Sequence, residues 1–492
     1  MQKNYYIIKK STNRNVVRTT TGEDVAVAKT LRFACNLLFS ILFGLVLVQL
    51  FLYNVQTDFV SALLLFPFLF LALWAFPHIM RSGRIRGFFH CFSYGKAWIL
   101  IQIPGILVLA AAFFTNKLEP SWDWGHTINI AIQYVTEGST SLLSYVAAYA
   151  NNRFWITVLI CFFKIILRIC PSASAEVFKT ALWILSDLLV IATVNLIYFT
   201  ARCYLTEKKA FFTGTLAALY LPVSLYGQIS YTDVPGMFLC ALTLFLYCRL
   251  RRTEGRKKLL LLIFLGIVAA IGYKLKVLVF IPVLAILIEE SLRGLSPDFF
   301  QAFRLKSPKL RLKGLKPCLL HMAIAACSFG LMFEAAGVLS DHMLAIPDGM
   351  IEEYELPLTH WIMMGLKGNG GYNGEDYGYT TGISGYQEKV SATVSVIKER
   401  LGQLDAKGLL KHIFHTKVRR TWCHSMLGSD DYTERNPLQE SSLFRELFSK
   451  SGSLSRPAHI LVSDYYFMLM RRVLASGIFS LIKSGKKASV LP

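Results

Sequence analysis

The chain has 492 residues, of which 54% are hydrophobic and 13% aromatic, and its formal net charge at pH 7 is +21. This is too apolar for a soluble enzyme, and the apolar residues come in blocks without the two-residue or 3.6-residue period of amphipathic elements. Lys and Arg cluster in short connections between these blocks, where they orient spans, so the charge does not indicate a nucleic-acid partner. The composition therefore predicts an all-α polytopic membrane protein.

The first apolar block, 31–54, is long enough for the roughly 20 residues that a bilayer-crossing helix needs. It follows a mostly polar segment and precedes many similar blocks, so it is not a cleaved signal peptide. Further spans are predicted at 59–78, 97–115, 178–201, 210–226, 234–250, 258–273, 276–290 and 317–337. The ten cysteines are scattered and form no CxxC pair or Cys/His cluster, so they indicate neither a zinc site nor a disulfide framework.

Lys and Arg in the connections predict which side of the membrane each connection faces. The richest connections are expected in the cytoplasm: 1–30, 81–96, 202–209, 249–258 and 291–316. This places 116–176 and 338–456 outside, provided that the block 153–170 does not cross. Lys164 and Arg168 lie four residues apart on one helical face, and a basic stripe on an apolar helix favours the interfacial plane. An ordinary span with snorkelling cations is the alternative.

The predicted organisation is a transmembrane core at 31–337, opened by an extra hairpin at 31–78, with about nine or ten spans. An extracytoplasmic polar region follows at 338–456. The last segment, 457–492, contains an apolar block interrupted by Asp464, Arg471 and Arg472. Because charges facing lipid are costly, this block predicts a weak tenth span or an interfacial helix.

Three features are expected inside the polar region 338–456. The glycine-rich stretch 368–382 fits neither a phosphate loop nor a calcium loop, and it predicts a turn-rich loop or lid. An amphipathic pattern at 388–404 predicts a helix. The basic and apolar stretch 407–422 predicts a helix on the outer membrane surface.

Several polar groups are predicted to meet at the outer face. The stretch "PSWDWGH" (120–126) places Asp123 between Trp122 and Trp124, close to His126. The loop "GQISYTDVP" (227–235) adds Tyr231 and Asp233, and "GYKLK" (272–276) adds Lys274 and Lys276. Reactive side chains that converge on one side of a helix bundle predict a functional site.

In this order, these motifs resemble the GT-C glycosyltransferases, including protein O-mannosyltransferases, the bacterial aminoarabinose transferase and Gram-positive "family 39" proteins. In that family the first external loop carries an acidic catalytic residue, a position that falls on Asp123. The segment "LPLTHWIMMGLKGNGGYNGEDY" (356–377) is similar to Gram-positive members. The resemblance covers residues 95–380. It departs from the family in the extra hairpin, in the single acid of "WDW", and in the absence of a run of final helices.

The resemblance implies a GT-C-like bundle in a bacterial plasma membrane that transfers a sugar from a polyprenyl phosphate. The acceptor would be a glycan, lipid or protein at the outer face. A polyprenyl phosphate leaves as an anion, so the chemistry needs a base for the acceptor hydroxyl and cations for the phosphate. Asp123 takes the first role, with inversion of the anomeric centre. The cations proposed for the phosphate are Lys274, Lys276, Arg153 and Lys164. Trp122 and Trp124 would stack on the sugar, with His126, Tyr231, Asp233 and His360 as further substrate contacts.

Other interpretations stay open. The alternative roles are interface anchors for the tryptophans, a helix cap for Asp233, snorkelling cations for the lysines and a packed side chain for His360. A divalent cation is also left open, since some GT-C enzymes use one and others do not. The alternative functions are a glycolipid flippase, for which Asp187 is the clear mid-span acid, and a catalytically inactive GT-C relative.

Overall fold

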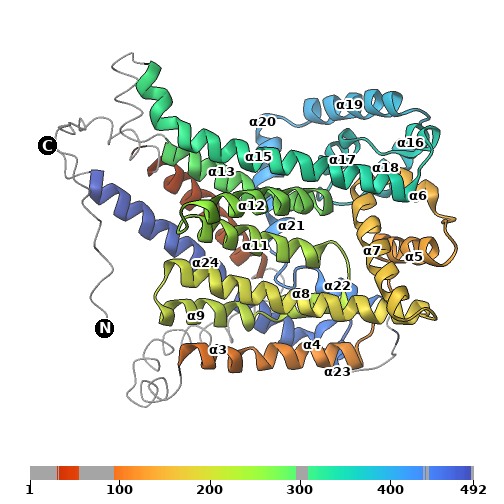
Figure 1. Ribbon diagram of the computed structural model, residues 1–492, viewed down its shortest axis with the longest axis horizontal. Helices are drawn as coiled ribbons and strands as arrows, with labels where there is room; N and C mark the ends of the chain where they lie inside the picture. Colours follow the sequence, from red (N-terminus) through yellow and green to blue (C-terminus); the bar gives the residue numbers. More distant parts are fainter. Residues whose placement is uncertain are drawn as a thin grey trace.

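The computed structural model describes residues 33–54, 93–294, 308–435 and 443–488, together with residues 30 and 438. Every regular element within these ranges is a helix, as the sequence predicts. Figure 1 shows the long helices running side by side, with short helices gathered at one end of the bundle. This all-α architecture is typical of a polytopic membrane protein.

In the described ranges, seven helices are long and apolar enough to cross a bilayer: Phe33–Asn54, Tyr94–Thr115, Ala175–Tyr204, Asp233–Leu250, Arg256–Leu275, Leu319–Leu344 and Ser455–Ile482. A pair bent by 57°, Glu207–Ala218 with Leu221–Gln228, makes an eighth candidate. The predicted span 59–78 lies outside the described residues. The predicted span 276–290 is absent from this set, because its helix begins only at Phe280 and has 15 residues, fewer than a crossing needs.

After Phe33–Asn54, the helices of the bundle are α3 (Tyr94–Ile101), α4 (Ile103–Thr115), α8 (Ala175–Tyr204), α9 (Glu207–Ala218), α10 (Leu221–Leu225), α11 (Asp233–Leu250), α12 (Arg256–Leu275), α13 (Phe280–Gly294), α15 (Pro308–Leu344) and α24 (Ser455–Ala488). The remaining helices are α5 (Trp122–Thr136), α6 (Leu143–Ala148), α7 (Ala150–Ile169), α16 (Asp348–Tyr354), α17 (Leu358–Gly365), α18 (Gly374–Thr381), α19 (Tyr386–Gln403), α20 (Ala406–Lys411), α21 (Val418–Trp422), α22 (Ser429–Glu434) and α23 (Leu443–Phe448). Short 3₁₀ turns lie at Tyr226–Gln228 and Val277–Val279, and a π-helical turn at His412–Lys417.

Helix α7 is the segment predicted to stay at the interface. It buries Ile156, Leu159, Ile160 and Phe163, whose spacing puts them on one face, while Lys164 is exposed. Figure 1 shows α7 lying across the direction of α8, α11 and α12, and α7 is not among the candidate spans of the described chain. That α7 lies in the plane of the membrane interface stays a prediction.

The C-terminal block forms a better span than the sequence suggests. Helix α24 is continuous, and its part Ser455–Ile482 meets the length and composition of a span. Asp464 is only 7% exposed, because it lies against the protein rather than facing lipid. The charge of Asp464 therefore does not face lipid, whereas Arg471 and Arg472 are exposed on this helix.

The polar region 338–456 folds into helices α16 to α23. The predicted amphipathic helix at 388–404 is present as α19, whereas the stretch 368–382 is a turn followed by α18. The stretch 407–422, predicted to lie on the membrane surface, packs against the first span, a contact that the sequence did not predict. Arg419 donates to Gln49, and the ring of Trp422 lies 5.6 Å from that of Phe43.

Candidate functional site

The acidic residue of the "WDW" stretch lies in the first turn of α5, which begins at Trp122. The turn before the helix is tight, because a Cβ on Gly125 would lie 2.5 Å from the carbonyl oxygen of Pro120. Trp122 has a φ of +53°, a conformation that is strained for a residue with a bulky side chain. The short connection from α4 thus fixes the direction in which Asp123 points.

A chain of hydrogen bonds starts at Asp123. The Tyr145 hydroxyl donates to Oδ1 of Asp123 over 2.7 Å, and Nδ2 of Asn152 donates to the Tyr145 oxygen over 2.8 Å. The Tyr231 hydroxyl then donates to Oδ1 of Asn152 over 2.9 Å. These contacts join α5, α6 and α7 to the loop before α11. The structure therefore brings Asp123 and the "YTD" loop together, through two residues that the sequence did not single out.

The two tyrosines in this chain of hydrogen bonds, Tyr145 and Tyr231, are protonated donors at neutral pH. Burial raises the pKa of Tyr145 above its ordinary value, and the neighbouring Asp123 carboxylate raises it further. The pKa of Tyr231 is also raised, by burial first and then by Asp123, with Asp233 adding to the effect. Both carboxylates thus lie close enough to Tyr231 to act on its hydroxyl.

Asp233 lies in the first turn of α11 and forms an ion pair with Lys276, which directly follows α12. Each of the two side chains is 30% exposed, so the pair is accessible from outside the bundle. This pair places one cation beside the chain of hydrogen bonds that starts at Asp123. Lys276 is therefore the predicted phosphate ligand that pairs with one of the two acids.

The two tryptophans flank a tyrosine from far along the chain. The ring of Tyr432, in α22, lies 6.1 Å from the rings of both Trp122 and Trp124. Burial raises the pKa of Tyr432 to about 12, and Asp233 and Asp123 contribute to this. The guanidinium of Arg435 lies 3.0 Å from the centre of the Trp122 ring. Trp122 is half-exposed, but Trp124 is only 2% exposed, so burial leaves Trp124 almost no surface for stacking on a sugar.

Three of the predicted cations have other positions. Arg153 donates to the carbonyl oxygens of Val146 and Ala147 and pairs with Glu355 over 2.7 Å, so these partners occupy its guanidinium. Lys164 lies on α7 about 18 Å beyond Asn152, given the rise per residue of a helix. Lys274 points at α15, with its Nζ 3.8 Å from the centre of the Phe333 ring. Arg153 thus follows Asn152 in the chain but is engaged elsewhere, and no contact with Asp123 is seen for any of these three cations among the described residues.

His360 is also removed from the predicted site. Its side chain is fully buried in α17, and its Nδ1 lies 2.8 Å from the Thr380 hydroxyl. Burial lowers the pKa of His360, which keeps the imidazole neutral. The burial of the ring and its contact with Thr380 favour the packed-histidine interpretation. His126, in contrast, is exposed, and its ring lies 4.9 Å from that of Tyr145.

The arrangement offers a hydrogen-bonded carboxylate, a second carboxylate paired with a lysine, and aromatic side chains at one end of a helix bundle. Among the described residues, no group of three His, Cys, Asp or Glu is placed to hold a metal ion. Sequence reasoning missed Tyr145, Asn152 and Tyr432. The stretch "SYVAAYANN" (144–152) carries polar side chains inside an apolar loop, which is a weak signal, and nothing local indicated Tyr432.

A family model for a conserved hypothetical integral membrane protein matches residues 25–425. The chain belongs to this integral membrane protein family. The match includes Asp123, Tyr145, Asn152, Tyr231 and the Asp233–Lys276 pair, and it ends before α22. No curated protein matches the chain, and no solved structure matches it. The family thus establishes a membrane protein, in agreement with the seven candidate spans of the described ranges.

Proposed function

We propose that this protein is a GT-C-like membrane glycosyltransferase. It transfers a sugar from a polyprenyl-phosphate donor to a glycan, lipid or protein acceptor at the outer face of a bacterial plasma membrane. The observation that carries the proposal is the hydrogen-bonded chain from Asp123 through Tyr145 and Asn152 to Tyr231. It unites the motifs whose order along the chain resembles that of the GT-C family.

The sidedness of the site supports an outer-face reaction. Helix α11 has 18 residues, about 27 Å of length, with Asp233 at its beginning and Arg249, Arg251 and Arg252 at or just beyond its end. Positively charged connections face the cytoplasm in most membrane proteins. If the basic end faces inward, Asp233 and the associated Asp123 lie at the opposite surface, where lipid-linked donors present their sugars.

Asp123 would act as the general base. Its carboxylate takes the proton of the acceptor hydroxyl while that oxygen attacks the anomeric carbon from the face opposite the phosphate. The bond from the anomeric carbon to the phosphate oxygen breaks, its electron pair leaves with the polyprenyl phosphate, and the configuration inverts. Tyr145 holds Oδ1 of Asp123, which directs the other carboxylate oxygen toward an acceptor. Lys276 would bind the departing phosphate by exchanging Asp233 for it.

The test is transfer of labelled sugar by the purified full-length chain in lipid nanodiscs, given polyprenyl-phosphate sugars and envelope glycan acceptors. Asp123→Asn keeps the size of the side chain and removes the base, so transfer should fall at least about a hundredfold. Asp348→Asn is the matched control, because Asp348 also lies in the first turn of a helix, α16, and it should keep full activity.

Unchanged transfer in folded Asp123→Asn would refute the assignment of the base. The absence of any new glycosidic bond with every donor offered to the wild type would refute the proposed reaction. Gel filtration and a melting curve for each variant show whether the fold is intact, so that a lost activity is not confused with a lost structure.

A second candidate function, lipid translocation, is favoured by Asp187 in the span α8. Its Oδ1 is buried without a hydrogen-bond partner among the described residues, and so are both amide atoms of Gln228. A Cβ on Gly227 would collide with the Asp187 carboxylate, so the glycine leaves room for it. A flippase would move a fluorescent glycolipid across vesicles without forming a glycosidic bond, and Asp187→Asn would slow that movement.

A further inference from the structure

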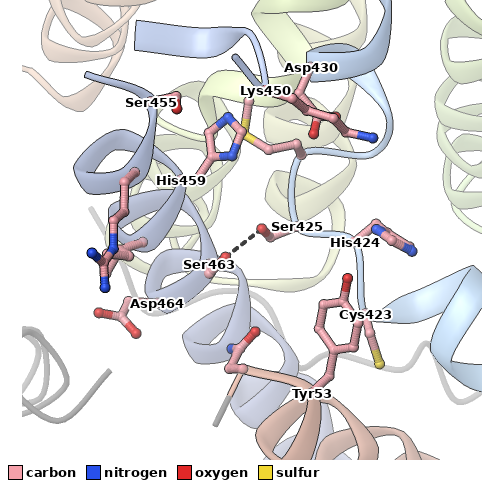
Figure 2. A pocket seen from close by; sticks show the side chains of 14 residues that line it. Tyr53, Cys423, His424, Ser425, Asp430, Lys450, Ser455, His459, Ser463 and Asp464 are labelled. Atoms are coloured by element: carbon pink, nitrogen blue, oxygen red, sulfur yellow. Dashed lines mark hydrogen bonds between the residues drawn. The ribbon is translucent and has the colours of Figure 1, made fainter. Parts of the chain in front are cut away.

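A polar pocket lies away from the Asp123 chain of hydrogen bonds, where three segments meet. It has a volume of about 350 Å³, at the lower end of ordinary small-molecule sites. Its walls are the end of the first span, the segment 423–430, and the beginning of α24. Figure 2 shows His459, Ser463 and Asp464 along α24, with Tyr53 and His424 on the facing segments.

The walls of the pocket are fixed to one another. The Ser425 and Ser463 hydroxyls lie 2.6 Å apart and join the segment 423–430 to α24. The rings of Tyr53 and His424 lie 5.5 Å apart and join the first span to the same segment. Buried apolar side chains of these elements pack in one cluster, including Leu50, Cys423, Met426, Val462, Tyr466 and Phe467. The pocket is therefore part of the packed structure and not a gap between loose loops.

The face of α24 that lines the pocket is polar with helical spacing. Five of its residues are spaced at intervals of three, one, three and one, so they share one face of the helix: Arg456, His459, Ile460, Ser463 and Asp464. This helix is otherwise apolar enough to span a membrane. A polar stripe on such a helix that faces a cavity indicates a ligand or a path for one.

Two polar atoms of this stripe are buried and have no hydrogen-bond partner among the described residues. They are Nε2 of His459 and Oδ2 of Asp464. Asp464 is only 7% exposed, so water in bulk does not solvate it. Buried polar atoms in native proteins almost always have partners, and each exception calls for an explanation. A ligand in the pocket would supply both missing hydrogen bonds.

The chemistry of these atoms selects the class of ligand. An ionised carboxylate only accepts hydrogen bonds, while an imidazole nitrogen donates or accepts according to its tautomer. A hydroxyl group satisfies either one. Both cations of the lining, Lys450 and Arg456, already have partners, and the Lys450 ammonium is held by Asp431 at 2.5 Å. An anion is disfavoured, because it would instead meet the carboxylates of Asp430 and Asp464. Among the described residues no three metal-ligating side chains are grouped.

We propose that this pocket binds a neutral, hydroxyl-rich group, namely a glycosyl unit, with its hydroxyls donating to Asp464 and bonding to His459. The pocket is joined to the Asp123 region by the segment 423–432, whose Tyr432 packs on Trp122 and Trp124. The binding itself does not depend on the proposed transfer reaction.

The proposal is tested by saturation-transfer NMR on the full-length chain in lipid nanodiscs. The probes are methyl α-mannoside, methyl β-galactoside and methyl α-arabinofuranoside, with inorganic phosphate as the anionic competitor. At least one glycoside should bind saturably, and Asp464→Asn should weaken its binding at least about tenfold, because a hydrogen bond to a charged acceptor is lost. Phosphate should not displace the glycoside.

Three further variants keep the test decisive. His459→Gln should also weaken binding, and it replaces Asp464→Asn if that variant does not fold. Glu334→Gln removes another acid from a candidate span, outside the pocket, and it should leave glycoside binding unchanged. Asp123→Asn should keep full glycoside binding while losing transfer, which separates this proposal from the proposed function. Absence of saturable binding, equal affinity in the pocket variants, or displacement by phosphate would overturn the assignment.

Discussion

Asp123 receives its hydrogen bond from a tyrosine, and this determines how the acid would work. Tyr145 is half-buried, its pKa is raised, and it therefore stays a neutral donor near Asp123 over the physiological range of pH. A neutral donor orients a carboxylate without cancelling its charge, which a salt bridge would do. Asn152 fixes Tyr145 in turn and links it to Tyr231. The chain of hydrogen bonds is thus a positioning device for the proposed base.

Replacing Tyr145 by Phe should therefore impair catalysis more than folding. The variant removes the hydroxyl that orients Asp123, and we expect kcat for sugar transfer to fall about tenfold to a hundredfold, with little change in KM for the donor. Tyr134→Phe is the matched control, because the Tyr134 hydroxyl donates to the carbonyl oxygen of Leu344 and does not contact Asp123. An equal loss in both variants would show that Tyr145 contributes only to stability.

At the scale of elements, the crossing of α12 and α15 holds the bundle behind the site. Gly266 lies at this crossing, where a Cβ would meet the Ser328 hydroxyl, the carbonyl oxygen of Ala325 and, at 3.0 Å, the backbone nitrogen of Phe329. The missing side chain lets the two helices approach, as small residues commonly do in membrane helix pairs. Because Lys276 directly follows α12, the position of this helix also sets the position of the Asp233–Lys276 pair.

Gly266→Ala should separate α12 from α15 and destabilise the protein. Two of the opposing atoms belong to the α15 backbone and cannot rotate away, so we expect a loss of about 2 kcal/mol, measured as a lower melting temperature in detergent. Gly330→Ala is the control on α15, since a Cβ there meets nothing within 4 Å. It should leave stability unchanged or slightly raised, because Ala favours helix more than Gly does. Equal melting temperatures of the two variants would contradict the close crossing.

At the scale of the whole molecule, the basic connection 249–258 and the candidate site belong to opposite ends of the bundle. Figure 1 shows α5, α6 and α7 at one end, together with α16, α17 and α18, while α11 and α12 are joined at the other. The connection 249–258 between α11 and α12 carries the basic residues expected on the cytoplasmic side. The proposed outer-face reaction requires this separation, because the site faces outward only if it lies opposite the cytoplasmic connection.

The sidedness can be measured with single cysteines in a background from which the ten native cysteines have been removed. A cysteine at Glu137, the exposed residue that ends α5, should react with a membrane-impermeant maleimide in intact cells. A cysteine at Glu254, between α11 and α12, should react only after the cells are broken. The reverse pattern would place Asp123 in the cytoplasm and exclude the proposed reaction.

The sequence by itself determined the membrane class and most of the spans, because each depends on a local run of apolar residues long enough for a bilayer. It also indicated Asp123, Tyr231, Asp233 and Lys276, whose motifs lie at the ends of such runs. The basic and buried faces of α7 were likewise visible locally, since they repeat with the helical period.

The tertiary structure decided which of these residues meet. Arg153, Lys274 and His360 were plausible by type and position, but packing gives them other partners. Tyr432 reaches Trp122 and Trp124 from α22, and Asp464 lines a pocket with the end of the first span. Such contacts join residues hundreds of positions apart, and the way the helices pack sets them. The hydropathy of a segment indicates that it will be buried, but it does not indicate which other segments it will pack against.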